Sequence, residues 1–153
     1  MKILVCGYGN PFRTDDGVGH ILAGEIAGWL QEAGEEAELR LEHQLLPELA
    51  ADFSGFDLLV FADARIQGTA EEVGFLLEEL SPDPILEGLN MHTVGPEWVL
   101  ALAAQLGERV PPAVLASVEG DSFDFGDELT PACALRKEAA LAAFREWFVR
   151  KHC

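Results

Sequence analysis

Basic residues, cysteines and long apolar runs are all scarce in this chain of 153 residues, and each scarcity excludes a class of protein. Lysine and arginine number 10 against 27 acidic residues, so the net charge is −17 and the surface repels the phosphates of nucleic acids. No apolar run approaches the roughly 20 residues that a membrane-spanning helix needs. Three cysteines without a paired motif do not make a disulfide framework. We therefore expect no nucleic-acid partner and no membrane insertion.

The rest of the composition is that of a folded protein. Hydrophobic residues make up 49% of the chain and charged residues 24%, with a mean hydropathy of +0.13. This length suits one domain, so we expect residues 1–153 to form a single α/β domain. The apolar start ends at Gly7 without a signal-peptide cleavage site, which favours the cytoplasm. No lysine or arginine lies between Arg65 and Arg109, so the charge is unevenly distributed along the chain. This distribution indicates a soluble surface, and docking of a basic partner on the acidic side is the alternative.

Apolar periodicity predicts an alternation of strands and helices. Strands are expected at 3–6, 37–42, 58–62, 73–77 and 114–118, and helices at 15–33, 45–53, 96–106 and from 131 onward. About nine residues separate Asp63 from the fourth strand, too few for a parallel crossover, so that strand should be antiparallel. The pattern predicts a three-layer α/β sandwich, whose five-stranded, mostly parallel mixed sheet carries helices on both faces. Sites in such sheets form beyond the carboxyl ends of the parallel strands.

The segment from Gly7 to Gly19, GYGNPFRTDDGVG, is the most informative part of the sequence. A glycine turn after a first strand is also typical of dinucleotide-binding proteins. Here, however, Phe12 stands where the third glycine belongs, and two carboxylates occupy the helix start that a pyrophosphate would need. Helix capping accounts for one of Asp15 and Asp16. It leaves the other carboxylate as a candidate site residue.

Asp63 and His92 are the other candidate site residues. Asp63 ends the predicted central strand, where a carboxylate needs a cation, a hydrogen-bond donor or a turn to stabilise it. His92 precedes the helix at 96–106, on a segment that can reach back about 36 Å toward Asp63. His20 and His152 are expected to be structural or exposed, and His43 is a weaker candidate.

Two carboxylates and an imidazole from three separate elements make a plausible three-ligand site for a divalent transition metal. Mixed oxygen and nitrogen ligands do not identify the metal. A receiver domain of a response regulator also has acids after its first and third strands. In that domain a lysine ends the fifth strand, whereas this chain has Ser117-Val118-Glu119-Gly120 at that point and no lysine. This difference disfavours a receiver domain.

Four segments together resemble the nickel–iron hydrogenase maturation endopeptidases over nearly the whole chain. They are Gly7-Tyr8-Gly9-Asn10 with Asp15-Asp16-Gly17-Val18-Gly19, Leu59-Val60-Phe61-Ala62-Asp63-Ala64, His92-Thr93-Val94-Gly95-Pro96, and Gly126-Asp127-Glu128-Leu129-Thr130-Pro131. By this resemblance the nickel-contacting residues are Asp16, Asp63 and His92, and Asp15 is a neighbour with a role at the helix start. One departure is that Asn90-Met91 precede His92, where small hydroxyl residues are common in the family.

The resemblance implies an endopeptidase that removes the C-terminal extension of a hydrogenase large-subunit precursor after nickel insertion. Nickel would come with the substrate, although other divalent metals would also suit the site. Asp16 and Asp63 are the candidate catalytic residues. The sequence contains no Ser–His–Asp arrangement, no activated cysteine and no His-Glu-x-x-His motif, so aspartic-type and metal-dependent hydrolysis both stay open. The alternative is a metal-binding accessory or receiver-like module without catalysis.

Overall fold

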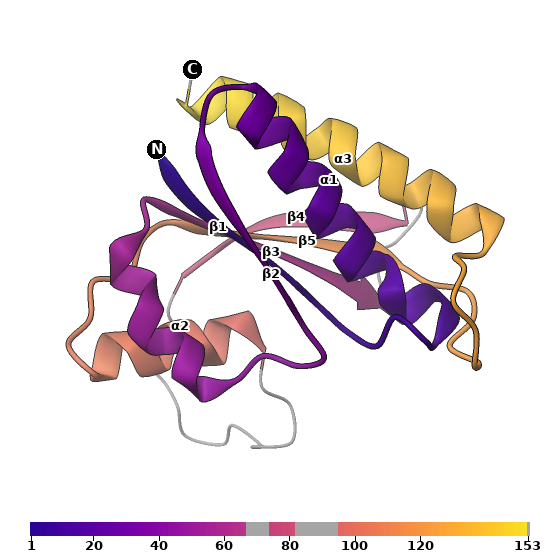
Figure 1. Ribbon diagram of the computed structural model, residues 1–153, viewed down its shortest axis with the longest axis horizontal. Helices are drawn as coiled ribbons and strands as arrows, with labels where there is room; N and C mark the ends of the chain where they lie inside the picture. The colour runs from indigo at the N-terminus through magenta and orange to yellow at the C-terminus, as the bar shows by residue number, and fades with distance from the viewer. Residues whose placement is uncertain (67–73, 82–94, 153) are drawn as a thin grey trace.

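The computed structural model describes residues 1–66, 74–81 and 95–152, which form one mixed sheet between two layers of helices (Figure 1). Its strands are β1 (Lys2–Tyr8), β2 (Glu36–Glu42), β3 (Leu58–Arg65), β4 (Phe75–Leu80) and β5 (Ala113–Glu119). The strand order is β2-β1-β3-β5-β4, and β4 alone of these five runs antiparallel to its neighbour. The predicted fold class is therefore confirmed, including the antiparallel fourth strand.

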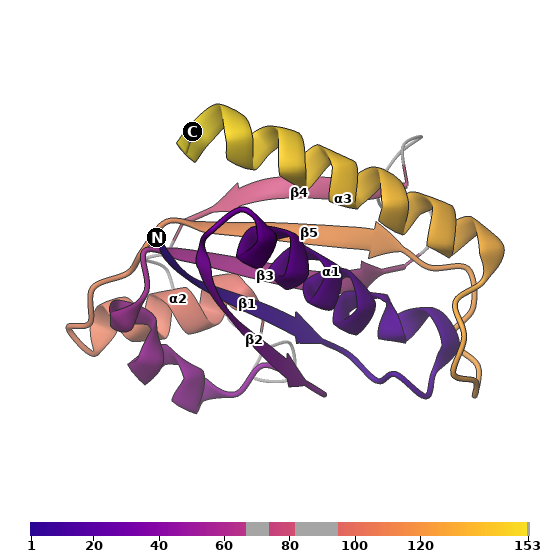
Figure 2. The same ribbon diagram turned by 45° about the horizontal axis from the view of Figure 1, so that its top comes forward.

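The helices cover both faces of this sheet. They are η1 (Thr14–Gly17), α1 (Val18–Glu32), η2 (Pro47–Gly55), α2 (Pro96–Gln105) and α3 (Pro131–His152), where η denotes a 3-10 helix. Figure 2 shows α1 and α3 above the sheet and α2 below it. Among the described residues, no helix combines the length and apolarity needed to cross a membrane.

Strand alternation divides the interior into two cores. Ile3 and Val5 point toward α1 and α3, whereas Leu4 and Cys6 point toward η2 and α2. Both sets are fully or almost fully buried, which explains why β1 is a continuous apolar run instead of an alternating one. By the same alternation, Tyr8 lies on the α2 side. Asp63, two residues after Phe61, has its side chain on this side for the same reason.

The topology also bears on the receiver-like alternative. Receiver domains have the doubly wound strand order 2-1-3-4-5. Here β5 lies between β3 and β4, and β4 is antiparallel to it. The short connection after β3 favours this arrangement, because a parallel neighbour would need a longer crossover. The sheet is therefore not that of a receiver domain.

The expected start of the first long helix needs correction. The long helix begins at Val18 and not at Asp15, because residues Thr14–Gly17 form a separate 3-10 turn. Thr14, at the start of this turn, has a φ of +49°, and its hydroxyl donates to the carbonyl of Asp124.

Candidate functional site

Asp63 lies near the carboxyl end of the central strand β3, with its side chain on the α2 side of the sheet. Its Oδ1 accepts a 2.7 Å hydrogen bond from the amide of Ala64. Burial, with the negative charge of Asp16, raises the pKa of Asp63 to about 7. The Ala64 amide, a hydrogen bond with Tyr8 and the charge of Arg65 act in the opposite direction without cancelling that effect. Asp63 is therefore poised to exchange a proton near neutral pH.

Asp16 comes from η1 and lies close enough to Asp63 for its charge to act on that pKa. Its Oδ2 accepts a 2.7 Å hydrogen bond from the amide of Asn10. Gly9, at φ +131°, presses against the backbone carbonyl of Asp16, and a Cβ there would overlap it. The turn around Gly9 and Asn10 thus holds the Asp16 carboxylate in place.

Tyr8 is a site residue that the sequence reasoning did not identify. It lies at the end of β1, where its hydroxyl hydrogen-bonds to Asp63, and burial raises its own pKa above the usual range. The tyrosine therefore stays protonated and acts as the donor in this bond. A signal was present in the sequence, because Leu4, Cys6 and Tyr8 alternate onto one face of the predicted strand.

Asp15, although adjacent to Asp16, has a structural role. It is fully buried and accepts four hydrogen bonds: from the amide and hydroxyl of Thr130, and from the amides of Asp121 and Ser122. Burial alone would raise its pKa, but these bonds outweigh burial and lower it. Asp15 ties the loop before α3 to η1. It thus supports the helix start through tertiary contacts and not through a cap.

Two of the three predicted metal ligands are thus brought together. Asp16 and Asp63 share the carboxyl edge of the sheet, as predicted, while His92 lies outside the described residues. Within residues 1–66, 74–81 and 95–152, no group of three potential ligands is positioned around one point. A divalent cation beside the two carboxylates would relieve their mutual repulsion, so the donors that are described suit an oxygen-binding metal.

The other candidates have simpler roles. His20 lies 2.9 Å from the carbonyl of Glu42, through its Nε2, and joins α1 to β2. His43 is exposed. Burial raises the pKa of the Cys6 thiol, and that of the Cys133 thiol, to about 12. Neither thiol is an activated nucleophile.

Asp63 also borders an open pocket of about 280 Å³. The pocket is lined by Asp63, Ala64, Arg65, Ile66, Leu115 and Ser117. Arg65 donates to the hydroxyl of Ser117 at 3.1 Å and lies 3.6 Å from Glu78. A peptide laid along this edge would meet a carboxylate, a guanidinium and apolar side chains.

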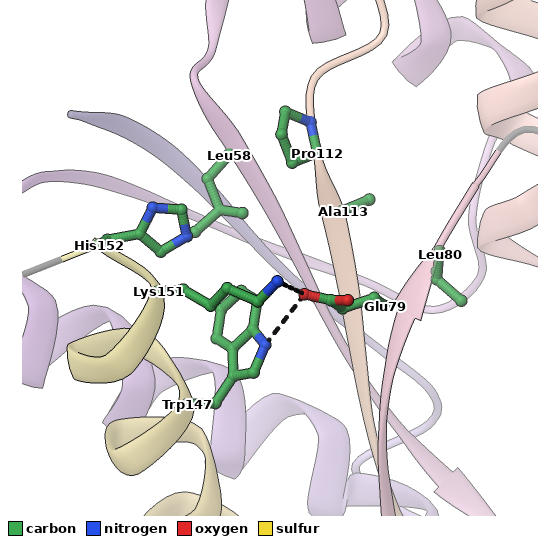
Figure 3. Close-up of a pocket in the computed structure, with 8 residues that line it drawn as sticks. All are labelled: Leu58, Glu79, Leu80, Pro112, Ala113, Trp147, Lys151 and His152. Atoms are coloured by element: carbon green, nitrogen blue, oxygen red, sulfur yellow. Dashed lines mark hydrogen bonds and ion pairs between the residues drawn. The ribbon is translucent and has the colours of Figure 1, made fainter.

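A larger pocket of about 330 Å³ lies at the opposite end of the sheet (Figure 3). The carboxylate in its wall, Glu79, is engaged by Lys151 at 3.0 Å and by the indole of Trp147 at 3.3 Å. The hydrogen bonds from these two side chains, Lys151 first, lower the pKa of Glu79. The charge of Glu79 is therefore compensated by its partners and its pKa is lowered, whereas the pKa of Asp63 is raised. Size alone therefore does not locate the site.

No protein-family model and no curated protein sequence matches the chain. Solved structures do match along nearly its whole length. The hydrogenase maturating endopeptidase HybD from E. coli has a TM-score of 0.71 and 23% identity, over 99% of this chain and 94% of that one. The NiFe hydrogenase maturation protease HycI from Thermococcus kodakarensis KOD1 has a TM-score of 0.61 and 26% identity, over 95% of this chain and 90% of that one.

A third match, the hydrogenase 2 maturation peptidase from a Thaumarchaeota archaeon, has a TM-score of 0.64 and 19% identity, over 97% of this chain and 98% of that one. The chain thus has the α/β fold of the maturation endopeptidases, with two acids at the carboxyl edge of its sheet. The resemblance to the nickel–iron hydrogenase maturation endopeptidases, first drawn from four sequence segments, is confirmed.

Proposed function

We propose that this chain is a cytoplasmic endopeptidase that removes the C-terminal extension of a nickel–iron hydrogenase large-subunit precursor after nickel insertion. The observation that carries the proposal is the juxtaposition of Asp16 and Asp63 on this fold. Two carboxylates, one of them with a pKa near 7, form a reactive edge. Solved proteins with the same fold are named as hydrogenase maturation peptidases.

In this proposal the nickel belongs to the substrate. Asp16 and Asp63, together with His92 from the sequence resemblance, complete the coordination of nickel already held by the precursor. The mutual repulsion of the two described carboxylates supports this role, since a cation between them stabilises both charged forms. Recognition then depends on the presence of the metal, and the bound metal fixes the position of the scissile peptide bond.

Asp63 is the group best placed to move a proton during hydrolysis. A general base must be ionised to accept a proton, and a cation bound beside Asp63 favours this charged form of its carboxylate. Its carboxylate takes a proton from the attacking water as the oxygen adds to the scissile carbonyl carbon. The carbon–nitrogen bond then breaks, and the leaving amine takes that proton. Tyr8 holds the Asp63 carboxyl in position by donating to it.

The test compares two precursors that are identical in sequence, one loaded with nickel and one without it. We expect a mass loss only for the loaded precursor, and its abolition in Asp16→Ala and in His92→Ala. His43→Ala, a change at an exposed histidine, is the matched control and should cleave normally. Equal cleavage of both precursors would refute nickel recognition but leave the peptidase standing. Binding of the loaded precursor without any cleavage would instead favour a metal-binding accessory.

A further inference from the structure

Two phenylalanine side chains project from the carboxyl edge of the sheet into solvent. Phe12 is 59% exposed and Phe125 is 94% exposed. Phe12 lies between β1 and η1, and Phe125 between β5 and α3. These two segments, far apart in the sequence, run side by side at one end of the molecule in both views (Figures 1 and 2). Neighbouring exposed aromatics, unlike isolated ones, are typical of an interaction surface.

Backbone pairing fixes the position of this phenylalanine pair. Arg13 and Gly126 form a parallel β-bridge, with bonds of 2.8 Å from the Gly126 amide to the Phe12 carbonyl and from the Thr14 amide to the Gly126 carbonyl. This register sets Phe12 and Phe125 at equivalent positions on adjacent segments. The Thr14 hydroxyl adds a 2.7 Å bond to the carbonyl of Asp124. Such preorganisation reduces the entropy lost on binding.

Hydrogen bonds connect the segments that carry Phe12 and Phe125 to the candidate site. Asn10, two residues before Phe12, donates through its amide to the Asp16 carboxylate, and its own side chain accepts from the Phe12 amide at 2.9 Å. On the other segment, Asp15 ties the backbone of Asp121 and Ser122 to η1. A partner held by Phe12 and Phe125 is therefore fixed relative to Asp16.

The charge around Phe125 restricts the kind of partner. Asp124, Asp127 and Glu128 flank it and are all exposed, on a chain with a net charge of −17. Anionic lipid surfaces and nucleic acids are repelled by such a surface, and so is a second copy of the chain. The complementary partner is a protein surface with an apolar pocket bordered by lysine or arginine.

We propose that the phenylalanine pair docks the folded body of the large-subunit precursor, at an apolar pocket bordered by basic residues, and so aligns its nickel with Asp16 and Asp63. The proposal rests on the proposed function for the identity of the partner. Docking by the folded body separates recognition of the correct precursor from recognition of the metal. The pair thus acts on specificity and takes no part in the chemistry.

The test uses the full chain and a nickel-loaded precursor, with the double variant Phe12→Ser/Phe125→Ser. We expect KM to rise at least about tenfold while kcat stays within about twofold, because the reacting groups are untouched. Leu106→Ser is the matched control: Leu106 is 60% exposed and follows α2, near the chain that enters β5. Its KM should equal that of the unaltered chain. Circular dichroism and a urea midpoint check that both variants remain folded.

Direct binding of the precursor keeps the two proposals distinguishable. Cleavage by the unaltered chain with an unchanged KM in the double variant would overturn the docking surface and leave the peptidase intact. If the unaltered chain binds the precursor through the phenylalanine pair but never cleaves it, the docking proposal is supported and the peptidase proposal is wrong. If the double substitution instead abolishes self-association, or binding to phosphatidylglycerol vesicles, and leaves precursor binding unchanged, the surface has another occupant and the docking proposal is wrong.

Discussion

Asp15, Asp16 and Asp63 have the same side chain, yet their surroundings give them different roles. Asp15 is buried among four donors that stabilise its charge. Burial and the negative charge of the neighbouring Asp16 raise the pKa of Asp63 to about 7. Charge on Asp15 thus favours the fold, whereas charge on Asp63 opposes it. Under the proposed function, a cation bound at this edge would offset the unfavourable charge on Asp63.

Asp63→Asn should stabilise the metal-free protein at high pH. Because the folded-state pKa of Asp63 lies above that of the unfolded chain, its contribution to stability falls as the pH rises from about 4 to 7. Asparagine keeps the acceptor for the Ala64 amide without this charge. We expect a gain in unfolding free energy of roughly 2–4 kcal/mol at pH 8 that vanishes below pH 4. Urea unfolding with a chelator measures it. A loss of stability at pH 8 would make Asp63 a structural residue.

Asp15→Asn should have the opposite effect. The pKa of Asp15 is lowered on folding, so its charge contributes stability above the unfolded pKa, and this contribution is lost as the pH falls through the folded value. An amide cannot accept from four donors, and we expect a loss of roughly 2–4 kcal/mol at pH 7 that shrinks in acid. Asp124→Asn, on the exposed surface of the same loop, is the control and should stay within about 0.5 kcal/mol.

At the scale of elements, the distance between α1 and the sheet is set by Gly19. A Cβ at this position would lie 2.6 Å from the carbonyl oxygen of Ala62 and 2.7 Å from that of Tyr8. The first turn of α1 therefore lies directly on β1 and β3, against Tyr8 itself and against the residue that precedes Asp63. This close approach is what brings η1, with Asp16, over the end of β3.

Gly19→Ala should accordingly destabilise the protein by several kcal/mol, on the order of an overpacked core position or more, because the clash is with backbone atoms. Gly28→Ala is a strict control within the same helix, since a Cβ added there would meet nothing within 4 Å. That change should stabilise by up to about 1 kcal/mol through helix propensity. Urea midpoints of the two variants measure the difference. Equal midpoints would refute the close-approach argument.

At the scale of the whole molecule, the charge of −17 should govern the rate of association with a basic precursor surface. We expect kcat/KM to fall as the salt concentration rises from about 50 to 300 mM, because the Debye length shortens. Asp127→Asn/Glu128→Gln should weaken this dependence, and Glu32→Gln, on the exposed end of α1, should leave it unchanged. A rate that is insensitive to salt would contradict electrostatic steering.

The sequence by itself determined the layers and the direction of every described strand. Apolar runs bounded by glycine and proline identified the elements to within a few residues, since periodicity and turn chemistry are local properties. The short connection after Asp63 was enough to predict an antiparallel β4. Motif spacing placed the Asp15–Asp16 pair and Asp63 at one edge, because parallel strands end together, and the family resemblance selected Asp16 from the pair.

Only the tertiary structure decided how the paired aspartates differ and which residues accompany them. The donors to Asp15 come from Asp121, Ser122 and Thr130, more than a hundred residues away, and no local pattern encodes such contacts. The same applies to Tyr8 as partner of Asp63 and to the pairing of Phe12 with Phe125. A pKa and an exposed surface depend on everything packed around a group, so they exist only once the chain has folded.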